Sequence, residues 1–259
     1  MKITCLLENT SSRPDILSQH GLSLLIETNS HRILFDMGQT DLFAQNAALL
    51  GIDLKAVDLA VLSHGHYDHG GGLPTFLEIN ENAPVYVSRH AFGQFFNGTE
   101  KYIGLDRTLQ GHPRLILTDG ETKIGDGLTL FSCNQRSRPN FLGCFGLTQR
   151  TDDGRLIDDP FLHEQYLLIE ENGKRVLVSG CSHKGILDIA AWFSPHLLIG
   201  GFHVSKMPLD ASLERVAHRL DQQKTTYYTC HCTGEEQYVF MKKHMKDLHY
   251  LSCGQTITL

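Results

Sequence analysis

Residues 59–72 read LAVLSHGHYDHGGG, an apolar run followed by three histidines and one aspartate among glycines. The apolar run predicts a buried strand, and the glycines allow the chain to turn tightly behind it. Side chains two residues apart in an extended segment point to the same side, so His64, His66 and Asp68 should share a side. His69 would reach that side by a turn of the chain. Imidazoles combined with a carboxylate suit a divalent ion such as zinc, iron or manganese, so this stretch predicts a metal site.

Later parts of the chain repeat this arrangement, in which an apolar strand leads into a loop that carries glycine and histidine. The expected strands cover residues 175–179, 196–199 and 227–229. The loops that follow them read SGCSH (179–183), GGFH (200–203) and CHCTG (230–234). This pattern would collect His64, His183, His203 and His231 along one edge of the structure.

The periodicity of the chain indicates an α/β (α+β) protein in which two sheets are covered by helices. Hairpins are predicted where 22–28 meets 33–35 and where 166–170 meets 175–179, the latter across an Asn-Gly turn. Helices are expected over residues 41–50, 186–192, 209–222 and 235–245, with another one after Pro74. A single domain is expected over 1–259, and 91–118 is expected to form a lid or substrate-facing insertion.

Composition restricts the class of partner. The formal net charge of −6 and the scattered Lys and Arg argue against a nucleic-acid partner, because phosphate binding needs a concentrated basic surface. No apolar run approaches the ~20 residues that span a bilayer. The first residues lack the features of a signal peptide, and seven cysteines in no dense pattern fit a reducing cytoplasm. We therefore expect a cytoplasmic protein that acts on a small molecule, without nucleic-acid or membrane partners.

The segment that contains His64, His66, Asp68 and His69 resembles the His-x-His-x-Asp-His motif of the metallo-β-lactamase superfamily. It follows a strand and precedes a helix, as in that family, and the resemblance extends over nearly the whole chain. The resemblance implies a four-layer αββα sandwich. It also implies that Asp36, in the segment FDMG (35–38), orients a metal ligand by a hydrogen bond without binding the metal itself.

The resemblance assigns further metal ligands by order and spacing. Cys181 falls where the family has its bridging ligand, and His231 falls where it has its last histidine. Two residues compete for the third histidine of the family: His163, which stands before the second hairpin, and His183, which lies in the same loop as Cys181. The alternative for Cys181 is a small buried thiol.

The remaining histidines and cysteines have less defined roles. His203 is expected to bind substrate, or metal, and would otherwise be a hydrogen-bonded core histidine. Cys230 and Cys232 flank His231 and resemble a redox or iron–sulfur motif, but the sequence lacks the partners that such a cluster needs. His20 is expected at the surface.

The resemblance implies a hydrolase with two divalent ions, zinc as the first choice and iron or manganese as alternatives. Asp68 would hold the second ion and orient a bound hydroxide that attacks an ester, amide or phosphoester. The loops 179–183, 200–203 and 230–234 resemble a subgroup that includes the archaeal 7,8-dihydropterin-6-methyl-4-(β-D-ribofuranosyl)aminobenzene-5′-phosphate synthase, so a transferase of that kind is the alternative. The third hypothesis is a non-catalytic protein that binds metal or has a redox role.

Overall fold

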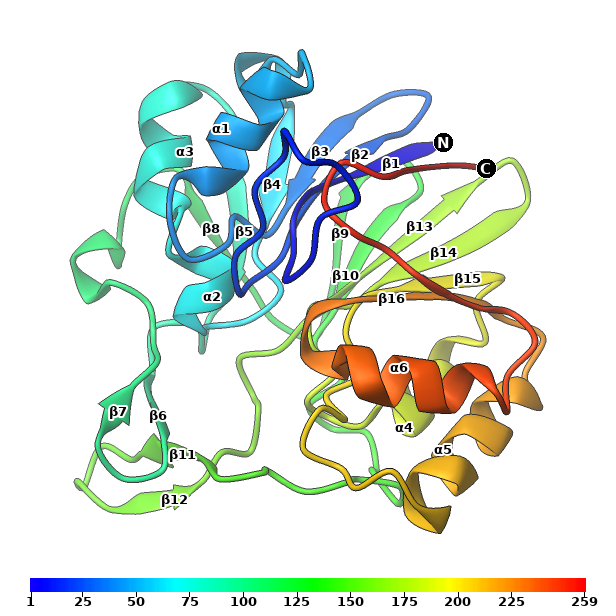
Figure 1. The fold of residues 1–259 in the computed structure, drawn as a ribbon. Coiled ribbons are helices and arrows are strands. Elements are labelled where there is room, and N and C mark those ends of the chain that lie inside the picture. Colours follow the sequence, from blue (N-terminus) through cyan, green and yellow to red (C-terminus); the bar gives the residue numbers. More distant parts are fainter.

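Two seven-stranded sheets lie face to face in the computed structural model, which describes all 259 residues (Figure 1). The first sheet has the order β18 (Thr256–Thr258), β1 (Lys2–Leu7), β2 (Ser23–Glu27), β3 (Arg32–Phe35), β4 (Leu59–Val61), β5 (Val85–Ser88), β8 (Leu115–Thr118). The second has the order β17 (Leu248–Tyr250), β16 (Thr226–Thr229), β15 (Leu197–Ile199), β14 (Lys174–Val178), β13 (Tyr166–Glu171), β10 (Leu128–Phe131), β9 (Glu121–Gly125).

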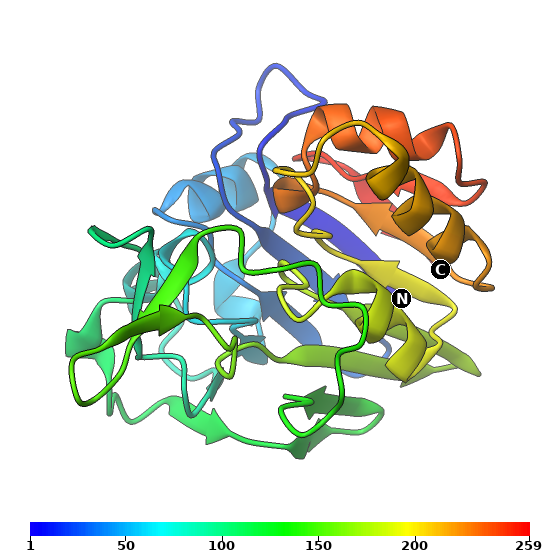
Figure 2. The same ribbon diagram turned by 90° about the horizontal axis from the view of Figure 1, so that it is seen from below.

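Helices cover the outer face of each sheet (Figures 1 and 2). The first sheet carries α1 (Leu42–Leu49) and α3 (Leu73–Ile79), with the short α2 (Tyr67–Gly70) beyond the end of β4. The second sheet carries α4 (Ile186–Phe193), α5 (Ala211–Asp221) and α6 (Glu235–Lys242). Single 3₁₀ turns are η1 (Leu54–Ala56), η2 (Arg107–Leu109) and η3 (His231–Thr233). The order helix, sheet, sheet, helix confirms the αββα sandwich, and none of these helices combines the length and apolarity needed to cross a membrane.

The strands bury side chains on both faces because apolar layers lie on either side of each sheet. In β2, Leu24 faces the layer between the sheets and Leu25 faces the layer under α1 and α3. In β13, Leu167 faces the layer between the sheets and Leu168 faces the layer under α4 and α5. These three layers make the strands almost continuously apolar, which is why their positions are readable in the sequence.

Parallel strands bring the histidine-bearing loops together. In the second sheet β14, β15 and β16 are parallel neighbours, and in the first sheet β4 is parallel to β3 and β5. The carboxyl ends of parallel strands meet at one edge of a sheet, where α/β proteins generally bind their ligands. The expectation that loops 179–183, 200–203 and 230–234 share an edge is confirmed by this topology.

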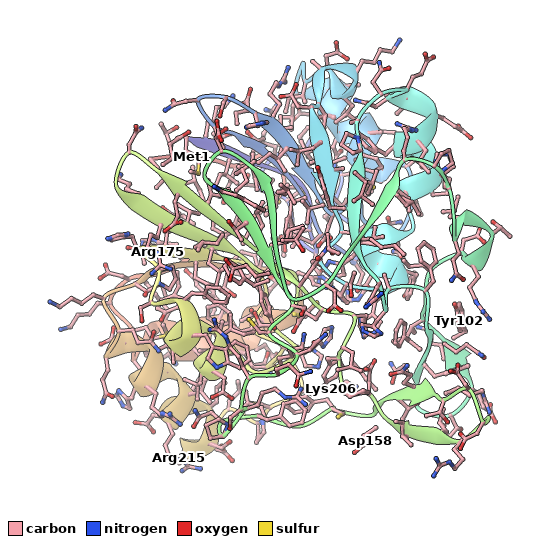
Figure 3. The ribbon with its side chains drawn as sticks, turned by 180° about the vertical axis from the view of Figure 1, so that it is seen from behind. Met1, Tyr102, Asp158, Arg175, Lys206 and Arg215 are labelled. Carbon is pink, nitrogen blue, oxygen red and sulfur yellow. The ribbon has the colours of Figure 1, made fainter.

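A small third sheet lies beside the two large ones. Its order is β12 (Leu156–Asp158), β11 (Leu147–Arg150), β6 (Gln94–Asn97), β7 (Lys101–Tyr102). Figure 3 shows this sheet, marked by Tyr102 and Asp158, on the side of the molecule away from Met1 and Arg175. The segment 91–118, expected as an insertion, therefore supplies two of its strands.

Two boundaries differ from expectation. The last four residues of 91–118 form β8, which pairs with β5 at the edge of the first sheet. Ile116 and Leu117 of β8 are 41% and 62% exposed, so no burial pattern marked the strand. The helix expected over 235–245 ends at Lys242, and the chain turns there into β17.

Substitution of Leu167 by Ala tests the layer between the sheets. Leu167 is fully buried, so the variant should lose about 2–5 kcal/mol of unfolding free energy, through lost burial and the cavity that remains. Urea unfolding followed by circular dichroism measures this loss. Leu117→Ala, at an exposed position, is the control and should change stability by less than about 0.5 kcal/mol. Equal stability of both variants would contradict this packing.

Candidate metal centre

The segment after β4 first runs extended and then turns into a helix. His66 has extended backbone angles and caps α2, so Asp68 and His69 lie on the first helical turn. The expected turn is present but begins earlier than predicted: Asp68 is already helical, so its carboxylate lies with His69 and His231 and not on the side that His64 and His66 share. Gly65 makes this path possible, because a Cβ at this position would collide with the carbonyl oxygen of Ala91.

One group of imidazoles, the first donor group, consists of His64, His66 and His183. One ring nitrogen from each lies within 4.8 Å of the other two. The Nε2 atoms of His64 and His183 are 3.3 Å apart, and the buried Nε2 of His66 has no hydrogen-bond partner. All three side chains are buried.

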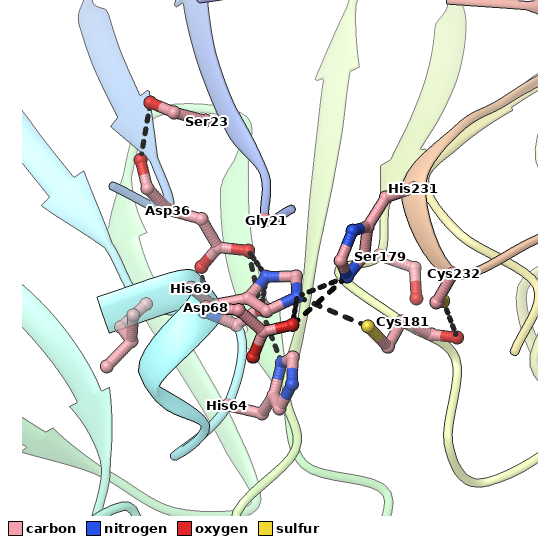
Figure 4. Close-up of polar contacts among 12 residues, drawn as sticks. Gly21, Ser23, Asp36, His64, Asp68, His69, Ser179, Cys181, His231 and Cys232 are labelled. Carbon is pink, nitrogen blue, oxygen red and sulfur yellow. Dashed lines mark hydrogen bonds and ion pairs between the residues drawn. The ribbon is translucent and has the colours of Figure 1, made fainter. Parts of the chain in front are cut away.

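The second donor group, Asp68, His69, Cys181 and His231, lies next to His64 of the first group (Figure 4). The Nε2 atom of His69 is 3.2 Å from Nε2 of His231 and 3.2 Å from the sulfur of Cys181. Asp68 Oδ2 is 3.4 Å from Nε2 of His231 and 3.9 Å from Nε2 of His69. The ring centroids of His64 and His69 are 4.1 Å apart, so the two groups adjoin.

Asp36 determines the tautomers of histidines in both groups. Its carboxylate accepts hydrogen bonds from His69 Nδ1 at 2.6 Å and from the Ser63 hydroxyl at 2.7 Å. Because the hydroxyl proton of Ser63 points to Asp36, its oxygen accepts from His64 Nδ1, which is 2.8 Å away. Both rings therefore carry their proton on Nδ1, and both leave an Nε2 lone pair facing the centre.

His231 is oriented in the same way by a different residue. Its Nδ1 lies 2.9 Å from Oδ1 of Asn9, an oxygen that also accepts from the backbone N–H of Gly21. The Nε2 lone pair of His231 consequently faces the Nε2 lone pair of His69 at 3.2 Å. Two acceptors at that distance make no hydrogen bond with each other, whereas a cation placed among them would satisfy both.

Burial and charge set the protonation of the site. Burial lowers the pKa of His64 and of His183 well below the ordinary value, so both rings are neutral near pH 7. Burial opposes the charged form of His69, but the carboxylates of Asp36 and Asp68 outweigh it and raise its pKa. Burial also opposes ionisation of Asp68, and His69 with the other facing histidines outweighs it, so the pKa of Asp68 lies well below its usual range. The neutral imidazoles of His64 and His183 and the ionised carboxylate of Asp68 are the forms that bind metal, and a bound cation would take the place of the additional proton that the carboxylates favour on His69.

The two candidates for the third histidine differ in their hydrogen bonds. His163 Nδ1 accepts from the backbone N–H of Gly65 at 2.9 Å, so its Nε2 carries the proton and donates to Asp159 at 3.0 Å. This leaves His163 with no lone pair to offer a cation. His183 instead stands in the first donor group.

The other candidate residues fall into different surroundings. His203 lines the cavity described below; both its ring nitrogens are buried and unpartnered, and its ring lies 4.2 Å from that of His183. Cys230 is buried in the layer between the sheets. Cys232, two residues further on, faces the cavity.

Three residues that hydrogen-bond members of the donor groups were not predicted from the sequence. His20, although 55% exposed, places Nε2 3.1 Å from Asp68 Oδ2. Asn9 orients His231, and the buried Glu164 accepts backbone N–H bonds from His183 at 2.6 Å and from Lys184 at 3.0 Å. The only local signal was the pair His20-Gly21, since a Cβ at Gly21 would collide with the backbone of Asp68.

A cavity of about 290 Å³ opens onto the donor groups. Its polar lining comes from both sheets and from the small sheet, and includes Asn9, His20, His66, Asp68, Asn97, Lys101, Cys181, His183, His203, Ser205, Lys206, His231 and Cys232. A larger depression, about 470 Å³ over residues 119–121 and 131–136, contains no histidine. Most of the candidate metal-binding residues therefore line the smaller of these two cavities.

Comparison with known proteins agrees with this geometry. Residues 19–133 match the family model described as the metallo-β-lactamase superfamily. A curated relative from Methanocaldococcus jannaschii, 7,8-dihydropterin-6-methyl-4-(β-D-ribofuranosyl)-aminobenzene-5′-phosphate synthase, is 31% identical over 93% of this chain and 90% of its own length. The chain belongs to the metallo-β-lactamase superfamily. Enzymes of this superfamily typically depend on divalent metal, and the donor groups described above can hold it.

Two further similar proteins match nine-tenths or more of the chain. An uncharacterised protein of the same archaeon is 30% identical over 90% of both sequences. The crystal structure of Tm1679, described as a metal-dependent hydrolase of the β-lactamase superfamily, covers 100% of this chain and 99% of its own, with a TM-score of 0.85 and 29% identity. These likenesses confirm the metallo-β-lactamase fold.

Asp36→Asn tests the tautomer arrangement. Asp36 has a φ of 59°, which Asn tolerates, so the backbone should be preserved. Oδ2 of Asp36 accepts from His69 Nδ1 and from the Ser63 hydroxyl, and Oδ1 accepts from the backbone N–H of Ser63, so an amide leaves one of these two sides without an acceptor. Metal affinity should fall by roughly 10–100-fold, as measured by competition with a chromophoric chelator. Asp41→Asn is the surface control, and unchanged affinity of Asp36→Asn would contradict the arrangement.

Proposed function

We propose that this chain is a metal-dependent hydrolase acting on an ester, amide or phosphoester of a small molecule. His64, His66 and His183 would hold one divalent ion. Asp68, His69 and His231 would hold a second, with Cys181 beside both. Zinc is the first choice because the set combines imidazole, carboxylate and thiolate donors, and iron or manganese are the alternatives.

One observation carries this proposal: buried nitrogen, oxygen and sulfur atoms of the kinds that bind metal converge in one small volume. The Nε2 atoms of His69 and His231 face each other at 3.2 Å, and the ionised carboxylate of Asp68 and the sulfur of Cys181 stand beside them. Buried polar groups are normally satisfied, so this arrangement requires a cation or additional protons. The sequence pattern of the donors favours the cation.

The chemistry divides between the bound ions and the residues of the chain. When bound, two ions would activate a water near neutral pH and polarise the scissile carbonyl or phosphoryl group. Asp68 accepts a hydrogen bond from His20 at 3.1 Å and would orient the attacking water. The free nitrogens of His203 can donate to an anionic group of the substrate. The cavity walls hold the substrate against these groups.

The surroundings support a small-molecule substrate. The cavity, at about 290 Å³, fits a small metabolite. The net charge of −6 disfavours a nucleic-acid substrate. All seven cysteines are free thiols, which fits the reducing cytoplasm that we propose as its location.

His66→Ala tests the hydrolase. Loss of an imidazole ligand should empty the first donor group and lower hydrolysis more than the ~10–100-fold typical of losing an outer partner. Metal content is measured by elemental analysis, and hydrolysis by a screen of ester, amide and phosphoester substrates. His249→Ala, on the exposed face of β17, is the matched control. Full activity in a metal-free His66→Ala protein would overturn the proposal.

A transferase of the synthase type is the second candidate. The 31% identity to the archaeal synthase over 93% of the chain supports it. Lys101 and Lys206 line the cavity near Tyr67, so cationic groups and an aromatic ring are available for a phosphorylated, ring-containing substrate.

Incubation of the protein with a dihydropterin pyrophosphate and the ribosyl-aminobenzene phosphate distinguishes the transferase from the hydrolase. The transferase predicts the coupled product and released pyrophosphate, which mass spectrometry detects. Lys206→Ala should weaken that reaction, mainly by raising KM, because its charge would face the phosphate. Absence of product with zinc, iron and manganese in turn would exclude this candidate.

The non-catalytic metal or redox alternative has less support. An iron–sulfur cluster on this segment would need Cys230 and Cys232 at one site together with further thiolates. Their side chains instead face different surroundings, the apolar layer and the cavity.

A further inference from the structure

We infer that Cys232 is a further sulfur donor of the metal centre, beside Cys181, which makes the second donor group sulfur-rich. The inference rests on the proposed metal-dependent function and concerns a residue that the His-x-His-x-Asp-His pattern does not include.

The first support is proximity. A nitrogen of His231, the sulfur of Cys181 and the sulfur of Cys232 all lie within 4.8 Å of one another. Zinc–sulfur bonds of about 2.3 Å place two sulfurs on one tetrahedral ion about 3.8 Å apart. The three donor atoms are thus close enough to bind one ion after small side-chain rotations.

The second support is the space made for this sulfur. A Cβ at Gly201 would collide with the sulfur of Cys232, so the GGFH loop keeps a glycine where the thiol enters the site. Figure 4 shows Cys232 turned toward the Cys181 loop, and its thiol donates to the Cys181 carbonyl oxygen at 3.4 Å. A thiol donor at 3.4 Å from a carbonyl is a weak interaction, which a metal–sulfur bond would replace with release of the thiol proton to solvent.

The backbone explains why Cys232 and not Cys230 takes this role. Cys230 has extended backbone angles and is fully buried among the apolar residues between the sheets. His231 follows with a φ of 49°, and the 3₁₀ turn η3 then carries Cys232 to the cavity. The segment Cys-His-Cys therefore delivers one imidazole and one thiol to the site and keeps its other thiol in the core.

A consequence is that the two donor groups differ in chemical softness. The first contains imidazoles alone, whereas the second contains two sulfurs, which favour zinc or cadmium over manganese. The second group should therefore select the thiophilic ion, and manganese should reach only the first.

Cobalt(II) titration of metal-free protein under reducing conditions tests the assignment without measuring activity. Cobalt bound by thiolates absorbs in the near ultraviolet, and this absorption grows with the number of sulfur ligands. Cys232→Ser should still bind cobalt but lose about half of that absorption, and Cys181→Ser should lose a similar share. Cys230→Ala is the matched control from the same segment and should keep the full absorption.

The outcomes separate this inference from the proposed function. An unchanged sulfur absorption in Cys232→Ser overturns the inference alone, whereas wild-type protein that binds no cobalt overturns the metal centre with it. Recovery of a disulfide-linked Cys181–Cys232 peptide from cobalt-loaded protein also overturns the inference.

A second measurement uses wild-type protein in case the variants fold poorly. Bound cobalt should protect Cys232 from alkylation by iodoacetamide and leave the partly exposed Cys144 equally reactive, as mapped by peptide mass spectrometry. Equal labelling of Cys232 with and without cobalt overturns the inference.

Discussion

The hydrogen bonds of one buried carboxylate orient a histidine in each of the two donor groups. Asp36 binds His69 directly and His64 through the Ser63 hydroxyl, so one side chain directs lone pairs in both donor groups toward the centre. Asp36 itself is fully buried, with a φ of 59°, a conformation that costs a non-glycine residue of the order of 1–3 kcal/mol. The fold can sustain that cost because apolar layers on both faces of the sheets support the loop that carries Asp36.

Strain recurs at the other loop residues of the centre. Ser182, His203 and His231 have φ values of 59°, 53° and 49°, and each lies just after a parallel strand of the second sheet. Sharp turns at these points direct side chains from adjacent strands into one small volume. A cation bound among these imidazoles would satisfy their facing nitrogens, so the fold supplies the geometry that the proposed metal needs.

Much of the fold and of the donor set could be predicted, because most donors lie in loops that follow apolar strands and contain glycine. His64, His183 and His231 carry that local signal. The choice between His163 and His183 could not be made locally, since it depends on a hydrogen bond from Gly65, which lies 98 residues away. Asn9 and Glu164 act through similarly distant contacts. The small sheet escaped prediction because it pairs β6 with β11, short segments with no clear periodicity.

Anomalous diffraction at the zinc edge, from crystals grown with zinc and without chelators, tests the central claim most directly. We predict one peak among the imidazoles of His64, His66 and His183, and a second beside His69 Nε2 and His231 Nε2. Crystals that bind no zinc there, with those two nitrogens still facing each other, would contradict this prediction.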